Sequence, residues 1–314
     1  MRAPEFWKSR GPLALMLAPL GCLYGLSVAK KAKAAAPLRS AAKIICVGNL
    51  TAGGSGKTPV ALAIAEALKA RGKTVFFLTR GYGGSETGPL VVKHHSAEAV
   101  GDEALLLART APTVVAADRA AGAKLAVAEG AEVIVMDDGH QNFTLAKDLS
   151  LVVVDGAAGF GNGFMIPAGP LREPVAQGLA RADAVIVMGD GDPDLDGFGK
   201  PVLRARLEPQ GDVAGKKIFA FAGIGRPEKF VTTLQSCGGQ VTGAQFFADH
   251  HPYTQSDIAA LKSWAGDAEL ITTEKDLVRL TPEMAAGIGA LKVRATFDQT
   301  QALARLLDRV LGAV

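Results

Sequence analysis

The stretch GNLTAGGSGKTPV, residues 48–60, decides the fold of this 314-residue chain. It closes on Gly56-Lys57-Thr58, as a phosphate-binding P-loop does, where the full pattern is Gly, four residues, then Gly-Lys-Ser/Thr. Counting back from Gly56 to the first position of that pattern gives Thr51 instead of glycine. The stretch is therefore either a nucleotide site with an altered entrance or a glycine-rich turn that resembles one by chance.

The surroundings of the loop favour the nucleotide site. KIICVGN (43–49) predicts a buried strand before the loop and TPVALAIAEALKARG (58–72) a helix after it, which is the context a P-loop needs. The glycines allow backbone N–H groups to turn toward a phosphate at the positive end of that helix. Lys57 would contact the β- and γ-phosphates and the Thr58 hydroxyl would bind Mg²⁺. The predicted nucleotide-binding residues are Thr51, Ala52, Gly53, Gly54, Ser55, Gly56, Lys57 and Thr58.

Beyond the loop, short β-branched runs alternate with alanine- and leucine-rich helical segments. EVIVMDDG (132–139), LSLVVVDG (149–156) and DAVIVMG (183–189) are continuous apolar runs, typical of parallel strands covered on both faces. The alternation predicts an α/β fold, a doubly wound and mostly parallel sheet around the P-loop. Asp137 and Asp138 end the first of these runs and resemble the strand-end carboxylates that lie beside Mg²⁺.

The pattern also predicts a second, smaller α/β domain. VLRARLEP (202–209) and LKVRATFD (291–298) alternate apolar and other residues, as half-exposed strands do, and they bracket a block with its own β/α alternation. We expect these strands to pair as a two-stranded linker. The expected bounds are 37–200 for the nucleotide domain, with 299–314 returning to it, 201–209 and 291–298 for the linker, and 210–290 for the smaller domain.

Basic charge is concentrated at the start of the chain. Residues 1–43 contain eight Lys or Arg residues and a single Glu, so the net charge of +3 leaves the remainder acidic on balance. The basic residues therefore do not indicate a nucleic-acid groove spread over a fold, and we expect no nucleic-acid partner.

Between the basic clusters, GPLALMLAPLGCLYGLSVA (11–29) carries no charge. Nineteen residues suffice to span a bilayer, but Pro19 and nearby glycines interrupt the run, and the basic AKKAKAAAP after it does not fit a signal-peptide cleavage site. We expect residues 1–36 to form a broken apolar helical segment in the membrane interface, with its cations on anionic headgroups. A helix hairpin packed on its own domain is the second interpretation, and one spanning helix the third.

Eight motifs, in order, resemble those of the tetraacyldisaccharide 4′-kinase family: GNLTAGGSGKTP (48–59), LTRGYGG (78–84), GDEALLLA (101–108), DDGHQN (137–142), GNGFMIPAGPLREP (161–174), FAGIGRPEKF (221–230), ADHHPYT (248–254) and TTEKDLVRL (272–280). The resemblance covers most of the chain. The family carries Thr at the Thr51 position, so the altered entrance is typical of this kind of P-loop.

The resemblance implies an enzyme that uses ATP and Mg²⁺ to phosphorylate the 4′-hydroxyl of tetraacyldisaccharide 1-phosphate, the lipid A precursor of Gram-negative bacteria. Its partners would be that acylated glucosamine disaccharide lipid and the cytoplasmic face of the bacterial inner membrane, which it would bind as a peripheral or monotopic protein. Nothing in the sequence indicates an oligomeric state. A membrane-associated P-loop ATPase switch is the alternative, disfavoured by the motif ADHHPYT in the second domain.

The resemblance also assigns residues to roles. Asp102 in GDE would take the proton from the acceptor hydroxyl, assisted by His250 in DH, and Lys57 would be catalytic with them. Asp102 alone is equally typical of a helix cap, and only the motif favours His250 over His251. The predicted metal ligands are Thr58, Asp137, Asp138, Gln141 and Glu173, and the predicted substrate contacts are Arg80, Tyr82, Asn142 and Arg172. Asn142 stands where the family often has His. Lys275 and Asp276 either serve the site or pin the loop after a strand.

Overall fold

A computed structural model describes residues 4–225 and 227–312. Residues 1–3 of the expected N-terminal segment, Arg226 of FAGIGRPEKF and the last two residues of the expected C-terminal return lie outside the described residues. Within the described residues, one sheet of twelve strands runs in the order β10-β9-β11-β12-β8-β7-β6-β1-β5-β2-β4-β3.

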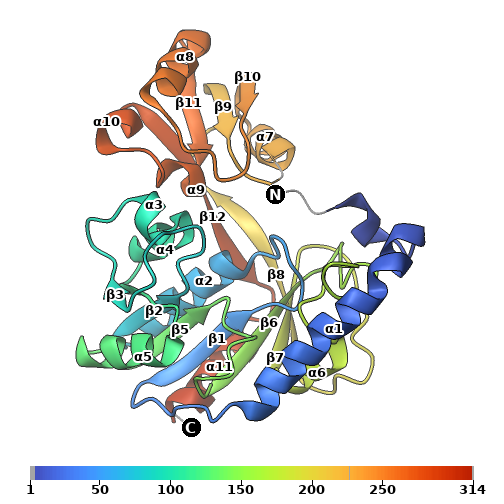
Figure 1. Cartoon of the computed structure of the whole chain (residues 1–314). Helices are drawn as coiled ribbons and strands as arrows, with labels where there is room; N and C mark the ends of the chain where they lie inside the picture. Colours follow the sequence, from blue (N-terminus) through green and yellow to red (C-terminus); the bar gives the residue numbers. More distant parts are fainter. Residues whose placement is uncertain (1–3, 226, 313–314) are drawn as a thin grey trace.

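The larger part of the molecule, at the bottom of Figure 1, holds seven strands that run parallel to one another. They are β1 (Lys43–Gly48), β2 (Val75–Thr79), β4 (Thr113–Val115), β5 (Val133–Asp137), β6 (Leu149–Asp155), β7 (Ala184–Met188) and β8 (Val202–Gln210). The short strand β3 (Leu90–Val91) joins β4 at the edge in the antiparallel sense. The predicted doubly wound, mostly parallel sheet is confirmed.

Helices cover both faces of this sheet because its strands are apolar on both sides. On one face, Ile45 and Val47 pack with α2 (Lys57–Lys69) and α11 (Thr300–Leu311). On the other face, Ile44 and Cys46 pack with α5 (Arg119–Ala128). The remaining helices of this part are η1 (Glu5–Lys8), α1 (Pro12–Ala34), α3 (Ala97–Val100), α4 (Asp102–Ala108) and α6 (Val175–Ala180).

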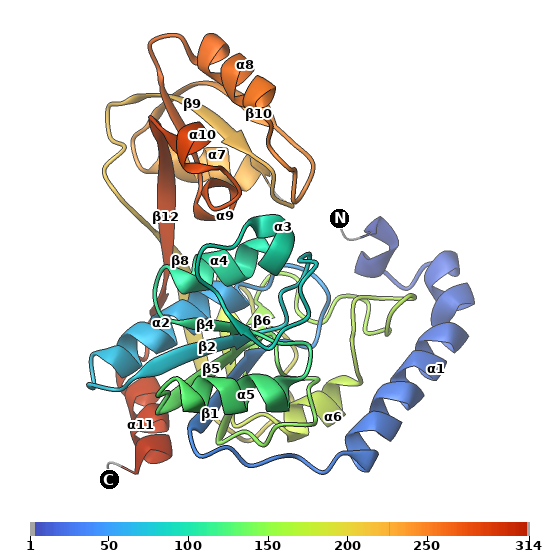
Figure 2. The ribbon, with the colours of Figure 1, turned by 60° about the vertical axis from the view of Figure 1, so that its left-hand side comes forward.

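A smaller part lies beyond the far end of β8, as Figures 1 and 2 both show. Its strands are β9 (Lys217–Ala222), β10 (Gln240–Phe246) and β11 (Glu269–Thr273), which are parallel to one another. Its helices are α7 (Pro227–Ser236), α8 (Gln255–Ala265), α9 (Glu274–Leu277) and α10 (Pro282–Ala285). Two apolar clusters, one under α7 and one under α8, give this part its own core.

Strand β12 (Ile288–Phe297) joins the two parts. Its first residues, up to Leu291, pair in parallel with β11, and Lys292 to Phe297 pair with β8 in the antiparallel sense. The strand begins three residues before the expected 291–298 run, within the block expected to form the smaller domain. One continuous strand is therefore shared by both parts of the sheet.

Helix α1 corrects one expectation about the N-terminus. It runs without a break from Pro12 to Ala34, with Pro19 inside it, where a broken helix was expected. Proline removes one backbone hydrogen bond and frees the carbonyl four residues earlier, at Leu15. Pro19 and Leu15 are both exposed, so water can bind that carbonyl and the helix continues.

Candidate active site

The glycine-rich loop lies at the carboxyl end of β1, between β5 and β6, where ligands bind in doubly wound sheets. Thr51 forms an antiparallel bridge with Leu171, and the Ala52 N–H donates to the Pro170 carbonyl at 2.7 Å. The chain enters the left-handed region only at Gly53 (φ 123°) and again at Gly56 (φ 84°). Position 51 is therefore extended and needs no glycine, which explains the altered entrance.

Helix α2 begins at Lys57 and brings two predicted side chains to the end of β5. Thr58 Oγ1 donates to Asp137 Oδ2 at 3.0 Å. Lys57 Nζ lies 3.7 Å from Asp138 Oδ1. Arg172 Nη1 also binds Asp138, at 2.8 and 2.9 Å from its two oxygens. Residues predicted from three separate motifs thus meet at one edge of the sheet.

The two adjacent carboxylates have opposite environments. Burial, the nearby charge of Glu103 and that of Asp138 together raise the pKa of Asp137 to about 7, against the opposing effect of Lys57. Burial also acts to raise the pKa of Asp138, but Lys57 and Arg172 outweigh it and hold that pKa below its ordinary value. Asp138 is therefore neutralised by the protein's own cations, whereas Asp137 has only the more distant charge of Lys57 to oppose its burial.

The environment of Asp137 fits a divalent cation. Its Oδ1 is buried and has no hydrogen-bond partner, and its other oxygen is bound by the Thr58 hydroxyl. Among the described residues, no group of three or more His, Cys, Asp or Glu side chains is arranged to hold a metal. Mg²⁺ often keeps water and phosphate oxygens in its shell and takes one or two protein ligands, so Thr58 and Asp137 suit it.

A second cluster forms where α4 meets the smaller part. Asp102 is the first residue of α4, whose N-cap is Gly101, so the structure does not support the reading of Asp102 as an N-cap. Gly101 has φ 83°, and a Cβ there would lie 2.4 Å from the Tyr82 carbonyl oxygen, so this tight turn requires glycine. The turn sets the Asp102 carboxylate against the smaller part, with its side chain 3% exposed.

Three basic side chains from the smaller part surround the Asp102 carboxylate. His250 Nδ1 lies 3.0 Å from Asp102 Oδ2. Arg279 donates to the same oxygen through Nε at 3.1 Å and Nη2 at 2.5 Å, and Lys275 Nζ lies 3.8 Å away. Burial acts to raise the pKa of Asp102, but the hydrogen bond from His250 and the charges of Lys275 and Arg279 outweigh it and place that pKa well below the ordinary range.

Backbone strain occurs at both clusters. Among the described residues, the non-glycine residues with positive φ are Asp138 at 52° and His250 at 61°. Such residues are uncommon and mark positions held in place by their surroundings. The His250 N–H donates to the Gly223 carbonyl at 3.1 Å, which fixes the strained turn against β9. His251, in contrast, binds Asp257 at 3.2 Å and stacks on Phe247, within the smaller part.

Gln141 and Glu173 form a separate network behind the P-loop. Gln141 Nε2 donates to the Asn49 carbonyl at 2.8 Å and to Glu173 Oε1 at 2.9 Å. The other oxygen of Glu173 accepts from Arg181 Nη2 at 2.5 Å. Both oxygens of this buried carboxylate are thus bound by protein donors. The geometry favours a structural role over the metal ligation expected for these two residues.

The remaining predicted substrate contacts differ in placement. Arg80 is exposed just after β2. Tyr82 is 72% exposed, and its ring meets the His250 ring edge-on with centroids 6.4 Å apart. Asn142 instead bonds within its own turn, to Thr144 at 3.1 Å and to the Leu145 N–H at 3.3 Å. It lines a pocket beside the stretch after α1 together with Phe143, Lys147 and Arg181.

Sequence reasoning missed three charged residues of this region. Glu103 follows Asp102 in GDE, and its charge reaches Asp137. Arg279 stands in TTEKDLVRL but was given no role. Arg119 is 5% exposed and its Nε has no hydrogen-bond partner, while burial and the charge of Arg80 lower its pKa to about 10. Glu103 and Arg279 belong to motifs already recognised, whereas Arg119 carried no signal of its own.

Comparison with known proteins identifies the family of this chain. Residues 13–312 match the family model for tetraacyldisaccharide-1-P 4′-kinase. The chain is 51% identical to a tetraacyldisaccharide 4′-kinase from Paramagnetospirillum magneticum, over 99% of both chains, and 49% identical to that from Rhodospirillum rubrum, over 99% of this chain and 98% of the relative. LpxK from Aquifex aeolicus, solved in complex with ATP, superposes on this chain with a TM-score of 0.79 and 27% sequence identity. The superposition covers 95% of this chain and 99% of that LpxK chain. The chain belongs to the tetraacyldisaccharide 4′-kinase family.

Proposed function

We propose that this chain transfers the γ-phosphoryl group of ATP to the 4′-hydroxyl of an acylated glucosamine disaccharide 1-phosphate. Family membership and the ATP complex of the structural neighbour support ATP as the phosphoryl donor. The observation that carries an acceptor reaction is the Asp102–His250 pair, which is built from both parts of the molecule and adjoins Glu103, whose charge acts on Asp137. A switch that only hydrolyses ATP needs no such pair.

On the nucleotide side, we propose that the loop amides from Thr51 to Gly56 bind phosphate oxygens and that Lys57 neutralises the transferring group. Thr58 and Asp137 would hold Mg²⁺, which when bound neutralises charge on the β- and γ-phosphates. Asp138 would position Lys57 and Arg172, since it already binds both cations. Gln141 and Glu173 hold the loop from behind.

On the acceptor side, we propose that Asp102 and His250 act as one pair. The hydrogen bond between His250 Nδ1 and Asp102 leaves Nε2, which lies 3.7 Å from Asp249 Oδ1, as the ring nitrogen that would accept the hydroxyl proton. Asp102, expected from the sequence to take that proton itself, would instead remain an anion and orient the ring, because its three basic neighbours disfavour protonation. Tyr82, next to the His250 ring, and Arg80 are the residues we propose to contact the sugar.

The decisive experiment supplies labelled ATP and Mg²⁺ together with acylated disaccharide 1-phosphate and follows label into a bisphosphorylated lipid. The matched acceptor is the same lipid lacking the 4′-hydroxyl, which should receive no label. Label released only as inorganic phosphate, at a rate that does not depend on the lipid, would instead identify an ATPase switch.

We further propose that α1 docks into the cytoplasmic leaflet of the inner membrane. One face of the helix packs on the body through Ala14, Gly21 and Gly25, and the last two lie against Met165. Its other faces expose large apolar side chains, namely Leu13, Leu15, Met16, Leu20, Leu23 and Leu26. By length and composition this helix is also able to cross a bilayer, but its packed face favours an orientation along the surface of the protein.

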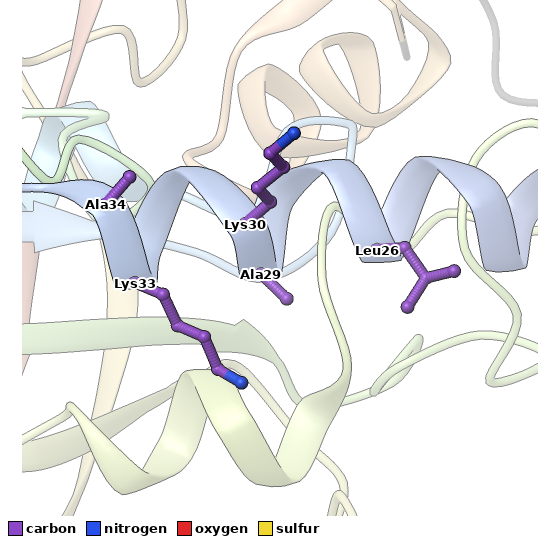
Figure 3. Close-up of a pocket in the computed structure, with 5 residues that line it drawn as sticks. All are labelled: Leu26, Ala29, Lys30, Lys33 and Ala34. Carbon is purple, nitrogen blue, oxygen red and sulfur yellow. The ribbon is translucent and has the colours of Figure 1, made fainter.

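The end of α1 adds cations to this apolar face. Lys30 and Lys33 extend from different sides of the last turns and line a pocket with Leu26, Ala29 and Ala34 (Figure 3). Each lysine near an anionic membrane surface contributes about 1 kcal/mol, and each buried leucine about 1.5–3 kcal/mol. Two leucine side chains therefore outweigh both lysines.

Vesicle binding tests this docking. We expect Leu23→Ser with Leu26→Ser to weaken binding at least about tenfold in low and high salt alike, because the lost contribution is apolar burial. Lys30→Gln with Lys33→Gln should weaken binding only at low salt, since salt screens surface charges. Cleavage of residues near the N-terminus by protease added outside intact spheroplasts would show that the segment crosses the bilayer and contradict interfacial docking.

A further inference from the structure

Arg279 is the most deeply enclosed of the three basic residues around Asp102. Its side chain is 4% exposed, whereas those of Lys275 and His250 are 27% and 36% exposed. It approaches Asp102 Oδ2 with two nitrogens of the guanidinium, Nε and Nη2, at 3.1 and 2.5 Å. These two charge-assisted donors fix the position of Oδ2, and the Glu103 N–H, which donates to Oδ1 at 2.9 Å, fixes the other oxygen. A lysine at this position would supply charge without that geometry.

The third nitrogen of Arg279 is anchored in the smaller part. Nη1 donates to the Gly223 carbonyl at 2.9 Å and to Asp276 Oδ1 at 2.8 Å. Asp276 is fully buried, and its Oδ1 also accepts from the Gly223 N–H and from the Tyr253 hydroxyl, each at 2.9 Å. The guanidinium is thus held in place on one side by hydrogen bonds within the smaller part, and its other side contacts Asp102.

This network unites motifs that are far apart in the sequence. Gly223 lies in FAGIG, His250 and Tyr253 in ADHHPYT, and Asp276 and Arg279 in TTEKDLVRL. Asp102 comes from the larger part, 177 positions away from Arg279. Arg279 therefore joins the two parts of the molecule at the carboxylate that binds His250.

The other charged groups that face Asp102 cannot replace this link. Lys275, on α9, divides its contact between Asp102 at 3.8 Å and Glu103 at 3.6 Å. His250 binds through one nitrogen, and its other nitrogen, Nε2, lies 3.7 Å from Asp249 Oδ1. Asp249 and Glu103, which is on the same helix as Asp102, both add negative charge beside the pair. Arg279 alone in this group both contacts the carboxylate twice and is anchored on its far side.

We propose that Arg279 is a positioning residue for phosphoryl transfer: it fixes the Asp102 carboxylate so that Asp102 in turn orients His250 toward the acceptor hydroxyl. This inference rests on the proposed function, because it requires a reaction in which the Asp102–His250 pair takes part. If Arg279 has this role, turnover requires the smaller part to be docked on the larger part. Nucleotide binding does not require docking, because its residues all belong to the larger part.

The proposal predicts a specific change in pH dependence. A positive charge beside the pair favours its deprotonated state, so removal of Arg279 raises the apparent pKa of the acid limb of kcat, which belongs to the pair as a whole. Loss of one charge at this distance corresponds to an upward shift of about 1 pH unit. A residue that only stabilises the fold would lower activity and melting temperature together without moving that limb.

The experiment compares Arg279→Ala and Arg279→Lys with wild type in the lipid phosphorylation assay. We expect kcat to fall about 10²-fold in Arg279→Ala, with the KM for ATP unchanged and the acid limb shifted upward. Arg279→Lys should keep the acid limb near its wild-type position but have only part of the wild-type kcat. Lysine keeps the positive charge but lacks the several N–H donors of the guanidinium. Arg294→Ala is the matched control: Arg294 also bridges the parts, through Glu66 at 3.3 Å and Glu274 at 3.5 Å, without touching Asp102.

A double variant separates positioning from stability even if the single variants are less stable. In the Asp102→Asn background, Arg279→Ala should lower kcat less than about twofold further, because residues that act through one another are not additive. Full additivity, an unmoved acid limb, or an equal loss of kcat in Arg294→Ala would each overturn the proposal. Absence of lipid phosphorylation by the wild-type protein would overturn the proposed function itself, so the two failures are distinguishable.

Discussion

Asp137, at the end of β5, and Asp102, at the start of α4, are both buried acids, but their surroundings are opposite. Asp137 receives one hydrogen bond, from Thr58, and leaves its Oδ1 without a partner. Asp102 receives donors on both oxygens, from the Glu103 N–H on one side and from Arg279 and His250 on the other. The hydrogen-bond acceptors of Asp137 are therefore only partly used, whereas those of Asp102 are fully used.

The difference teaches which charges the protein supplies for itself. A buried carboxyl with a pKa raised to about 7 is poorly stabilised as an anion until a cation arrives from outside. A carboxylate held by three basic groups is ready before any ligand binds. We infer that the nucleotide side is completed by Mg²⁺ and phosphate, whereas the acceptor side is preorganised by the docking of the smaller part.

The largest expected effect comes from removing the protein's own cation on the nucleotide side. Lys57→Ala should lower turnover about 10³–10⁵-fold, the range found when a cation on a transferring phosphoryl group is lost. Lys69→Ala is the control. Lys69 lies at the other end of α2, where its amine donates to the Thr110 carbonyl at 2.8 Å. Phosphate transfer and thermal melting are measured for both. Turnover near wild type in Lys57→Ala would remove the P-loop from the mechanism.

Next comes Asp102→Asn on the acceptor side. We expect a loss of about 10²–10⁴ in kcat with ATP affinity retained, because the amide keeps the shape but does not hold the imidazole as an anion does. Asp118→Asn is the matched control, since Asp118 caps α5 through the Ala120 and Ala121 N–H groups and Asn is an equally good cap. If both variants lose activity only in proportion to stability, Asp102 has no role beyond structure.

A smaller effect, on stability, tests the surroundings of Asp137. The folded protein holds the pKa of Asp137 near 7, above its unfolded value of 3.8, so the Mg²⁺-free protein loses stability as pH rises from about 4 to 7. The loss is of the order of 4 kcal/mol at most, and Asp137→Asn removes it. At pH 8 the Mg²⁺-free variant should therefore melt higher than wild type, by ~2–4 °C for each kcal/mol, with little difference near pH 4.

Asp138→Asn provides the opposite sign for that comparison. The pKa of Asp138 is held below its ordinary value, so ionised Asp138 stabilises the fold above its unfolded pKa, and the variant should melt lower than wild type at pH 8. Melting curves at pH 4 and pH 8, without Mg²⁺, check both variants. Equal shifts in the two variants would show that the environments of the adjacent carboxyls do not differ.

The smallest expected effect on turnover is that of Tyr253→Phe in the network around Asp276. Its hydroxyl is one of several donors to Asp276, and the Gly223 N–H, Thr273 and Arg279 remain after its removal. We expect the free energy of unfolding to drop by about 1.5–3 kcal/mol, the value of a hydrogen bond to a charged group, and kcat to change less than about tenfold. A fall in kcat as large as that of Arg279→Ala would mean that the network lacks the assumed redundancy.

Much of the fold could be predicted because its strands are continuous apolar runs with turn residues at their ends. The first three residues of β12 were missed because Gly287 precedes Ile288 and Gly289 follows it, and pairing with β11 overrides that local signal. The continuity of α1 was missed because proline is expected to break a helix. That rule carries less weight where the freed carbonyl is exposed to water.

The site divides along similar lines. Lys57, Thr58, Asp137 and Asp138 follow from a local motif, because strand, loop and helix are contiguous in sequence. Arg279 lies three residues after Asp276, and the sequence alone suggests only an ordinary i, i+3 ion pair between them. Only the tertiary fold brings it to Asp102. Glu173 was predicted as a metal ligand from its motif, and the hydrogen bonds from Gln141 and Arg181 to its two oxygens are tertiary contacts that the sequence does not show.

The return of α11 to the larger part has a consequence for synthesis on the ribosome. Leu303, Leu306 and Leu307 complete the apolar layer over the face of the sheet that also carries α2. These residues are translated after the whole smaller part has been made. A nascent chain therefore cannot complete this apolar layer until the smaller part, which has its own core, has left the ribosome or is about to leave it.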